Sequence, residues 1–490
     1  ALATFGFGIM FERLLYPLNI MFTTYGNGRA MPRPSFAHSD KAFYYVVLVG
    51  VVLTAAAMIV LQRSRLGRML RGLADSPVAV SAMGLSTNIT RVMVFCISAF
   101  FAAIAGILYG SSINIVTGSE AYYSSFNSLI LIAVLTLAPF AAVPWYAIFA
   151  GMTVVIPGYL TGQNTPYWMN VVFGVFAMLV ASEGGTRPMP AVLRRQFDRL
   201  GGNWPRRKPL PAADAAAGWT PTVVAGTDDR SRGLQVEHLM VRFGGLVAVR
   251  DLSLAAPAGR ITGLIGPNGA GKTTTFNAVF GLNRPASGTV HLDGVDVSRY
   301  GMAARARRGL GRSFQIPELC ESLTVAENVA LGHETSLAGA QVHTQLWTPA
   351  ADRHSTAAAT ASAMQLCGIT HLAGLQAGGL STGQRRLVEL ARCLAGPFHL
   401  LLLDEPSAGL DRNETEQFGE VLRRVVDERG IGILLVEHDM SLVMSVCSYL
   451  YVLDFGALIY QGTPAEVATS DVVKNAYLGS EILAADGQSA

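Results

Sequence analysis

The sequence is poor in charged residues, which make up 14% of its 490 positions, whereas apolar residues reach 51%. The formal net charge is only +3, so the broad basic face of a nucleic-acid-binding protein is not expected. A chain of this length exceeds one ordinary hydrophobic core. Because the apolar excess is concentrated in residues 1–182, we expect a membrane part followed by a soluble part.

Cysteine is also scarce. The five cysteines are widely scattered and never in CxxC spacing, which argues against a disulfide framework and against a cysteine zinc site. We therefore expect a reducing, cytoplasmic environment for the soluble part. The sequence begins ALATFGFGIMFERLL, without Met and without a basic region before its apolar stretch. A signal peptide is not expected, and we expect the N-terminus to lie inside a membrane domain whose front is missing.

Long apolar runs are present in the first part of the chain. Residues 42–62 and 90–110 are each long enough to cross a hydrocarbon core of about 30 Å at about 1.5 Å per residue. A partial candidate lies at the start, and three further candidate spans follow at 126–143, 145–160 and 168–182. The alternative, a buried helix of a soluble protein, stays open for the short run at 168–182.

The arginines predict the orientation of the spans. Arg63, Arg65, Arg68 and Arg71 lie between the first two long runs, whereas residues 111–125 contain no Lys or Arg. By the positive-inside rule, the arginine-rich loop is cytoplasmic.

A linker and a soluble domain follow the apolar part. Residues 184–233 are rich in Pro, Gly, Ala and charge, a composition typical of a linker. Further on, ITGLIGPNGAGKTTTFNAVFG places an apolar strand, a glycine loop and a helix in that order. This order, with G-x-x-x-x-G-K-[ST], predicts a phosphate-binding loop. Its residues are Gly266, Pro267, Asn268, Gly269, Ala270, Gly271, Lys272, Thr273 and Thr274.

The chemistry of such a loop predicts a bound nucleotide phosphate and Mg²⁺. Backbone N–H groups and the helix N-terminus surround the phosphates, while Lys272 reaches the β- and γ-phosphates. The Thr273 hydroxyl is a predicted magnesium ligand.

A second site element follows the apolar run HLLLLDEP, which is typical of a central parallel strand covered on both faces. It ends in Asp404 and Glu405, at the strand end where α/β sheets bind ligands. We expect Asp404 to hold magnesium through its hydration shell and Glu405 to act as general base on the attacking water. Another strand, GILLVEHDM, is expected to end at His438.

The order of these motifs over residues 234–480 resembles the nucleotide-binding domain of ABC transporters. That order is P-loop, Gln315, LSTGQ, DEP, SAGLD and His438. The resemblance implies that Gln315 is a catalytic residue that couples magnesium and water to the membrane domain. It implies that His438 contacts the γ-phosphate, that Asp411 bridges two ATPases, and that Phe243 stacks on adenine.

The LSTGQ loop resembles the ABC signature, with Thr382 in the middle of the usual LSGGQ. By this resemblance Ser381, Gly383 and Gln384 contact the γ-phosphate of ATP held by a partner's P-loop, as a helix N-terminus favours. A complete site is then expected to need a second ABC ATPase subunit.

The finer resemblance is to Liv-type branched-chain amino acid importers. RSFQIPELCESLTVAENVALG and GTPAEVATSDVVKNAYLG are similar to the ATPase, and FCISAFFAAIAGILYG to the permease. It implies an all-α transmembrane permease domain, N-terminally truncated, at residues 1–183. An α/β P-loop NTPase with a helical subdomain follows at 234–480, and a tail at 481–490. Residues 72–86 are expected to include the helix that docks on the ATPase.

The resemblance also implies partners and a location. The partners are a second permease subunit and an extracytoplasmic solute-binding protein, and the location is the lipid bilayer of a bacterial inner membrane, crossed several times. One departure bears on the solute: Thr136 to Phe140 stand where this permease family generally has a Gly-Gly pair. Other amino acids, amides, urea or small carboxylates therefore stay open as solutes. Alternatives of another class are a membrane-tethered ABC ATPase that does not transport and a subunit that no longer hydrolyses ATP.

Overall fold

The computed structural model of the chain describes residues 2–15, 18, 29–116, 171, 175, 178 and 232–477. Contacts divide the chain into two compact units, one formed by Ala1–Thr54 and Ser98–Lys208, the other by Ala55–Ile97 and Pro209–Ala490. The second unit therefore joins part of the N-terminal half to the soluble half. Several predicted features lie outside the described residues: the spans at 126–143 and 145–160, most of 168–182, Thr136 to Phe140, nearly all of the linker, and the tail.

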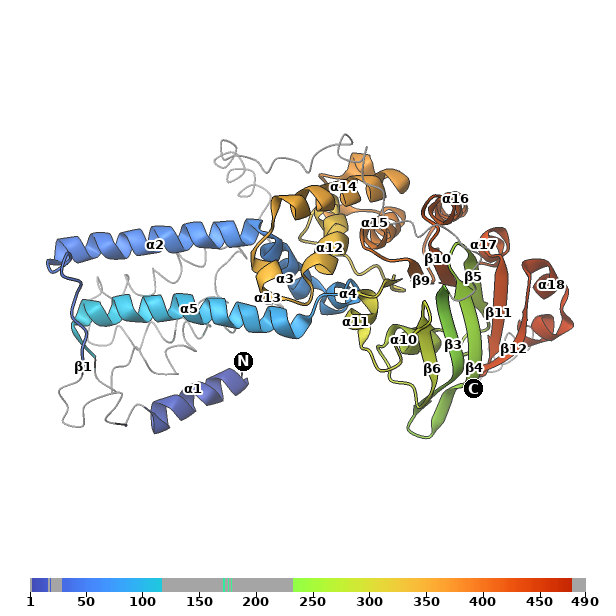
Figure 1. The fold of residues 1–490 in the computed structure, drawn as a ribbon, viewed down its shortest axis with the longest axis horizontal. Helices are drawn as coiled ribbons and strands as arrows, with labels where there is room; N and C mark the ends of the chain where they lie inside the picture. Colours follow the sequence, from blue (N-terminus) through green and yellow to red (C-terminus); the bar gives the residue numbers. More distant parts are fainter. Residues whose placement is uncertain are drawn as a thin grey trace. The chain divides into compact units, whose positions relative to one another are not determined.

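Helices form most of the described N-terminal half (Figure 1). They are α1 (Leu2–Leu14), α2 (Asp40–Arg63), α3 (Arg65–Asp75), α4 (Pro77–Ala82) and α5 (Thr87–Ile113). In α2 and α5, of 24 and 27 residues, a stretch is long and apolar enough to cross a membrane, and at most 6% of it is buried. They coincide with the predicted spans at 42–62 and 90–110.

The start of α2 and the end of α5 lie next to each other within the first unit. Strand β1 (Arg29–Ala30) pairs antiparallel with β2 (Ile115–Val116). Arg33 places Nη1 2.6 Å from Asp40 Oδ1 and donates from Nε to the Ser111 carbonyl at 3.4 Å. Because opposite ends of the two helices meet here, α2 and α5 run antiparallel.

The second unit contains a six-stranded sheet with the order β12-β11-β5-β10-β9-β8. Its neighbouring strands are parallel except for the β11–β12 pair. A four-stranded antiparallel sheet has the order β4-β3-β6-β7. The strands are β3 (Gly233–Phe243), β4 (Leu246–Pro257), β5 (Ile261–Ile265), β6 (Ser287–Leu292), β7 (Val295–Asp296), β8 (Leu310–Arg312), β9 (Leu400–Asp404), β10 (Gly432–Val436), β11 (Tyr449–Asp454) and β12 (Ala457–Gly462).

Helices connect and cover these strands. They are α10 (Lys272–Phe280), α11 (Met302–Ala306), α12 (Val325–Ala338), α13 (Val342–Leu346), α14 (Ala350–Leu366), α15 (Thr382–Ala395), α16 (Arg412–Arg429), α17 (Met440–Val446) and α18 (Pro464–Thr469), with 3₁₀ turns η3 (Thr370–Leu372) and η4 (Ala377–Gly379). Capping boxes begin α12, α15, α16 and α18. Each box satisfies two backbone groups that a helix start otherwise leaves unpaired.

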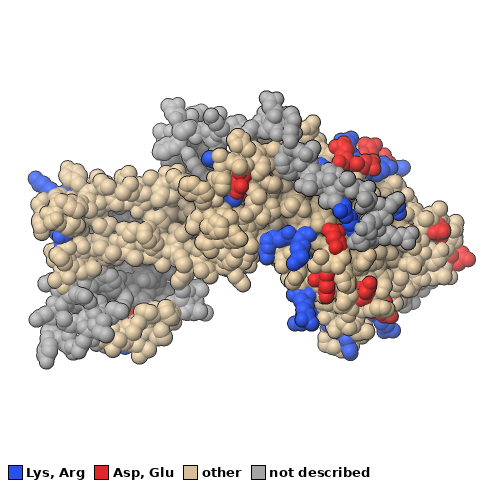
Figure 2. All heavy atoms as spheres, viewed as in Figure 1, with Lys and Arg blue, Asp and Glu red and all other residues tan. Residues whose placement is uncertain are grey.

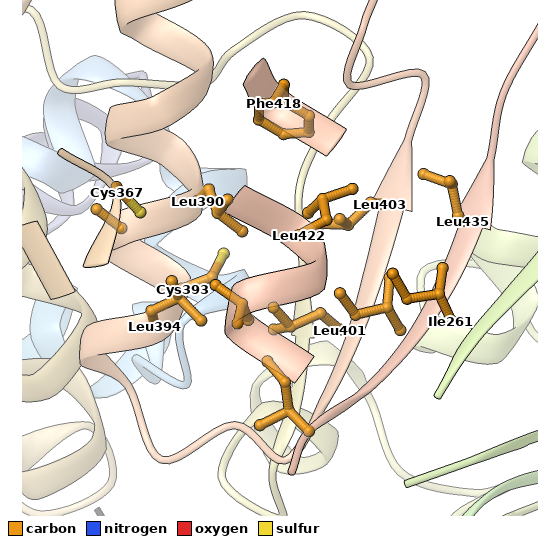
Figure 3. Close-up of a cluster of buried hydrophobic side chains, with 14 of the residues drawn as sticks. Ile261, Cys367, Leu390, Cys393, Leu394, Leu401, Leu403, Phe418, Leu422 and Leu435 are labelled. Carbon is orange, nitrogen blue, oxygen red and sulfur yellow. The ribbon is translucent and has the colours of Figure 1, made fainter. Parts of the chain in front are cut away.

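The parallel strands are apolar on both faces because both faces are covered. In β9, Leu401 and Leu403 pack in one core cluster, whereas Leu400 and Leu402 pack in another. Figure 3 shows the first cluster between β9, β10, α15 and α16. The prediction of a doubly covered central strand from HLLLLDEP is therefore confirmed, and the end of β9 is held from both sides.

A third core cluster joins the two halves of the sequence inside the second unit. It contains Met69, Val80, Met83 and Leu85 from the segment between α2 and α5, and Cys320, Leu323, Leu331 and Ala338 from the soluble half. Ser76 ends α3 and caps α4, accepting from the backbone N–H of Ala79. Pro77 at the first position favours the start of α4. The cluster begins at Met69 and so extends beyond the expected docking segment at 72–86.

Candidate active site

The predicted phosphate-binding loop connects β5 to α10, in the order that the sequence predicts. Gly266 and Gly271 have φ values of 152° and 96°, which favour glycine. A Cβ at Gly271 would lie 2.6 Å from the Ala248 carbonyl. The loop therefore needs glycine both for its conformation and for the close passage of β4.

Lys272 points back into this loop from the first turn of α10. Its Nζ donates to the carbonyls of Gly266 at 2.6 Å and Pro267 at 2.9 Å, and the side chain is 6% exposed. Burial lowers the pKa of Lys272, against the opposing charges of Glu405 and Asp404. A buried ammonium ion with a third N–H available suits a phosphate oxygen.

Asp404 ends β9 beside this lysine and is paired with an arginine. Arg312 donates from Nη2 to Asp404 Oδ2 at 3.1 Å, and both side chains are at most 3% exposed. Burial raises the pKa of Asp404, against the lowering effect of the Arg312 charge. The Arg312 guanidinium carbon lies 5.3–5.8 Å from the ring centroids of Phe276, Phe280 and Phe314.

The donor set at the strand end fits Mg²⁺. Asp404 Oδ1 is buried and has no hydrogen-bond partner, which is costly unless a cation or its water occupies the site. Thr273 is exposed at the start of α10, so its hydroxyl is accessible. Carboxylate and hydroxyl oxygens together with phosphates are the usual magnesium ligands.

Glu405 brings the three predicted catalytic residues together. Its Oε2 accepts from Gln315 Nε2 at 2.8 Å, and its Oε1 lies 2.7 Å from His438 Nε2. Glu405 has φ of 47°, an uncommon value for a residue with a side chain. Its N–H bonds to the Val436 carbonyl at 2.8 Å, which holds this conformation. Such a cluster is able to orient a water molecule and accept its proton.

The strand before His438 ends earlier than expected. β10 ends at Val436 instead of His438, because Glu437 turns to accept hydrogen bonds from the N–H groups of Ser407 at 2.7 Å and His438 at 3.1 Å. Burial raises the pKa of Glu437. This turn directs His438 towards Glu405.

Ser381, Gly383, Gln384 and Asp411 form a second group at the starts of α15 and α16. Ser381 Oγ accepts from Gln384 N at 3.3 Å, and Asp411 Oδ1 accepts from the N–H of Glu414 at 2.8 Å. A Cβ at Gly383 would lie 2.7 Å from Glu414 Oε1, so the two helix starts are adjacent. Both present N-terminal backbone N–H groups, which favour an anion.

Phe243 is the last residue of β3. Its side chain is 50% exposed. The residue pairs with Leu246 of β4, and Ala248 of the same strand passes the P-loop at Gly271.

Sequence reasoning missed Arg312. Nothing in GRSFQIPEL indicates that the arginine pairs with a carboxylate 92 positions later. The one signal in the sequence was the position of Arg312 at the end of the short strand LGR, which contains no acidic residue to pair with it.

Comparisons with known proteins identify the family of the chain. Residues 249–408 match the ABC transporter family. The high-affinity branched-chain amino acid transport ATP-binding protein BraF of Pseudomonas aeruginosa is 36% identical over 248 residues, 50% of this chain and 97% of BraF. The high-affinity branched-chain amino acid transport ATP-binding protein LivG of Salmonella typhimurium is 38% identical over 253 residues, 50% of this chain and 97% of LivG.

Two further matches complete the comparison. The lipopolysaccharide export system ATP-binding protein LptB of Haemophilus influenzae is 35% identical over 248 residues, 51% of this chain and 98% of LptB. A crystal structure of a nucleotide-free ATP-binding cassette from an ABC transporter is 27% identical, with a TM-score of 0.45, covering 50% of this chain and 98% of that one.

The chain belongs to the ABC transporter family, and its soluble half is an ATP-binding, ATP-hydrolysing domain of that class. Residues 1–181 match the permease component of the branched-chain amino acid transport system. The chain thus carries a membrane-associated permease-type domain followed by an ABC ATPase domain.

Proposed function

We propose that this chain is a fused permease and ATPase subunit of an importer. It uses ATP hydrolysis to take up branched-chain or related amino acids across a bacterial inner membrane. The observation that carries the proposal is the third core cluster, in which residues 69–85 of the permease-type half pack against the ATPase. A domain that hydrolyses ATP and is packed on a cytoplasmic loop of a permease is arranged to drive transport.

The chain has four segments with different roles. Residues 1–183 form the permease domain, 184–233 the linker, 234–480 the ATPase, and 481–490 a tail. Several spans carry the chain across the bilayer, and the arginine-rich segment with Arg65 and Arg68 lies on the cytoplasmic side.

Within the ATPase, Lys272 and the backbone of residues 266–274 hold the phosphates, and Phe243 stacks on adenine. Magnesium, when bound by Thr273, Gln315 and Asp404, neutralises charge on the β- and γ-phosphates. Glu405 accepts the proton of the attacking water, His438 contacts the γ-phosphate, and Gln315 reports the state of the site to the permease. The Gln315–Glu405–His438 hydrogen bonds support these roles.

A second ATPase subunit completes the site. The starts of α15 and α16 present Ser381, Gly383, Gln384 and Asp411 together, as a surface for a partner's γ-phosphate requires. A second permease subunit and an extracytoplasmic solute-binding protein complete the assembly.

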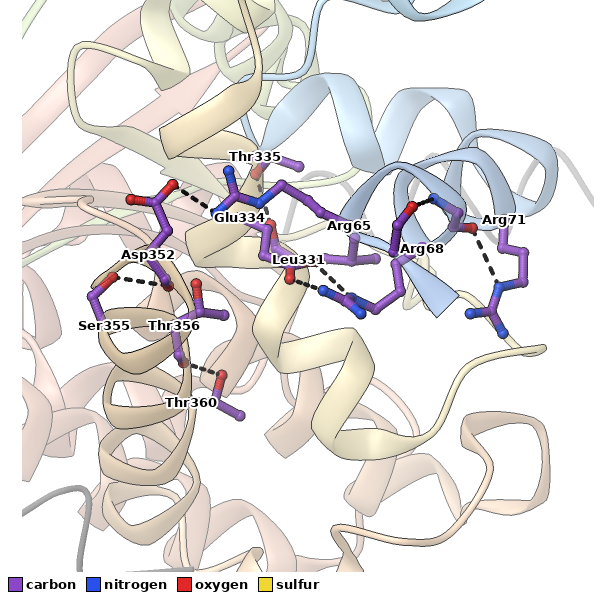
Figure 4. A network of polar contacts seen from close by, with 12 residues as sticks. Arg65, Arg68, Arg71, Leu331, Glu334, Thr335, Asp352, Ser355, Thr356 and Thr360 are labelled. Atoms are coloured by element: carbon purple, nitrogen blue, oxygen red, sulfur yellow. Dashed lines mark hydrogen bonds and ion pairs between the residues drawn. The ribbon is translucent and has the colours of Figure 1, made fainter. Parts of the chain in front are cut away.

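Ion pairs support coupling between the permease segment and the ATPase (Figure 4). Arg68 forms a two-point ion pair with Glu334 of α12, and its Nε lies 2.9 Å from Oε2. Arg65 Nη2 lies 2.9 Å from Asp352 Oδ2 of α14. Thr335 Oγ1 donates to the Met83 carbonyl at 2.9 Å. A movement of α12 is therefore transmitted to α3 and α4.

The solute is proposed from the permease match and from BraF and LivG. LptB belongs to an export system yet matches the same half at 35% identity, so the ATPase half alone does not select the solute. Amides, urea and small carboxylates remain the competing solutes.

The test is ATP hydrolysis by the full-length chain in proteoliposomes with its partner subunits. The solute-binding protein is added after loading with leucine, with other amino acids or with small amides. We expect leucine, isoleucine or valine to stimulate turnover, and Glu405→Gln to abolish it. Robust hydrolysis that no amino acid alters would refute the solute. Unchanged hydrolysis in Glu405→Gln would refute the assignment of the general base.

A further inference from the structure

An uncharged, apolar surface lies on the ATPase at helix α13. Residues 335–351 contain no Asp, Glu, Lys or Arg. Val342, Leu346 and Trp347 are 49%, 52% and 76% exposed. Figure 2 shows no charged side chain over α13 on the face in view. We call Val342, Leu346 and Trp347 the α13 patch.

Two contacts place α13 beside the end of α2 and the start of α5. Thr90, in the first turn of α5, donates from Oγ1 to Gln345 Oε1 at 3.2 Å, and both side chains are fully buried. Arg65, two positions after the end of α2, donates from Nη1 to the Thr344 carbonyl at 3.1 Å. Helix α13 is therefore held where α2 ends and where α5 begins.

We place the start of α5 at the edge of the hydrocarbon layer. Residues 92–113 of α5 carry no charge, and 22 helical residues extend about 33 Å, close to the hydrocarbon thickness. Arg91, which directly precedes them, is exposed and marks the headgroup level. Thr90 and Gln345 lie at the same level.

The chemistry of the patch fits that location. Tryptophan is enriched at the membrane–water boundary, because its ring is apolar while its N–H remains hydrated. Valine and leucine on one side of a short helix add apolar area, as in helices that lie in the interface. In water the same patch has no stabilising role, and large exposed apolar groups usually mark an interaction site.

We propose that the α13 patch inserts into the headgroup layer of the cytoplasmic leaflet and so anchors the helical subdomain of the ATPase to the lipid surface. The anchor is joined to the first turn of α5 by the Thr90–Gln345 hydrogen bond. It holds α12 at a defined distance from the lipid surface, while Arg68 and Glu334 transmit movement between α3 and α12. The inference rests on α5 spanning the membrane.

The experiment measures lipid proximity in the full-length chain reconstituted in vesicles of phosphatidylethanolamine and phosphatidylglycerol. A fluorescent maleimide is attached to Leu346→Cys in a Cys96→Ser background. Quenching is measured with a lipid that carries a nitroxide near the headgroup end of its acyl chain. Burial raises the pKa of Cys320 to about 11 and of Cys447 to about 12, so these thiols do not compete.

Two controls bracket the result. Native Cys96 is exposed on α5, so the label at Cys96 reports whether α5 lies in the membrane. Val295→Cys, at an apolar position 44% exposed on β7, reports a solvent-facing site. We expect the label to lose emission at Cys96 and at position 346, and none at position 295. Trp347→Tyr is expected to keep the quenching at position 346, whereas Trp347→Glu is expected to reduce it.

Other outcomes overturn the proposal in different ways. Quenching at Cys96 without quenching at position 346 refutes the anchor alone. If the emission at position 346 is then blue-shifted, protein covers the patch, either another part of this chain or a second copy of it. No quenching at Cys96 refutes both the anchor and the spanning role of α5.

Discussion

Arg68 and Glu334 allow a quantitative test of how the permease segment is held on the ATPase. The Glu334 side chain is 3% exposed and that of Arg68 18%, so Arg68→Met leaves the carboxylate buried without its partner. Loss of one member of a buried ion pair costs about 3–5 kcal/mol. Because Arg68 is partly hydrated, we take the lower end, about 3 kcal/mol.

This cost predicts a change in the docking equilibrium. Each 1.4 kcal/mol is about tenfold in an equilibrium constant, so Arg68→Met weakens docking of α3 and α4 on α12 by about 100-fold. The readout is amide hydrogen exchange of α3 and α12 in the reconstituted full-length chain. Protection of these amides is expected to fall by about the same factor.

Matched variants separate the charge pair from packing. Glu334→Met is expected to cost less than Arg68→Met, because the Arg68 side chain is 18% exposed and reaches water. The double variant Arg68→Met, Glu334→Met leaves no buried charge and is expected to recover most of the protection. Arg71→Met is the control, since Arg71 donates to Gly67 and Gln62 in its own segment. Equal loss in the single and double variants would show that packing of the third core cluster, and not the ion pair, holds the segment.

Four further predictions concern the ATPase. Arg312→Met is expected to destabilise the ATPase domain by about 3–5 kcal/mol, because the buried Asp404 carboxylate loses its partner. It is also expected to lower kcat, because the Arg312 charge lowers the pKa of Asp404 and so keeps this predicted magnesium ligand ionised. An unchanged melting temperature together with an unchanged kcat would refute this reasoning. Phe243→Ala is expected to raise the KM for ATP by about 5- to 100-fold, the value of one aromatic–base stack, with Phe243→Tyr as the control and kcat nearly constant. Burial lowers the pKa of His333 from its ordinary value of 6.5. Below pH 6.5 the unfolded chain therefore binds a proton at His333 that the folded chain does not bind. The melting temperature is expected to fall on acidification. It is expected to fall less in the His333→Gln variant, and an equal fall in both proteins would contradict this reasoning. Leu401 is fully buried in β9 (Figure 3), and Leu401→Ala is expected to destabilise the ATPase domain by about 2–5 kcal/mol. The measurement is urea unfolding of the domain. A loss of unfolding free energy below about 1 kcal/mol would contradict the packing described.

Local signals in the sequence were sufficient for much of the fold. A phosphate-binding loop depends on glycines and a lysine that are contiguous, so the strand, loop and helix around Lys272 were predictable. A central parallel strand is a continuous apolar run, so β9 and its terminal carboxylates were predictable as well. The spans at α2 and α5 follow from length and hydropathy, because a helix must satisfy its own backbone in lipid.

The pairings across long sequence separations were decided by the tertiary structure. Arg68 and Arg65 read as juxtamembrane charges in the sequence, yet they pair with Glu334 and Asp352. Arg312 similarly meets Asp404, and Glu405 meets both Gln315 and His438. The sequence by itself determined the class of the protein and the chemistry of its loops, because those depend on neighbouring residues. Only the fold decided which charges face each other, because burial and partner choice depend on how distant segments pack.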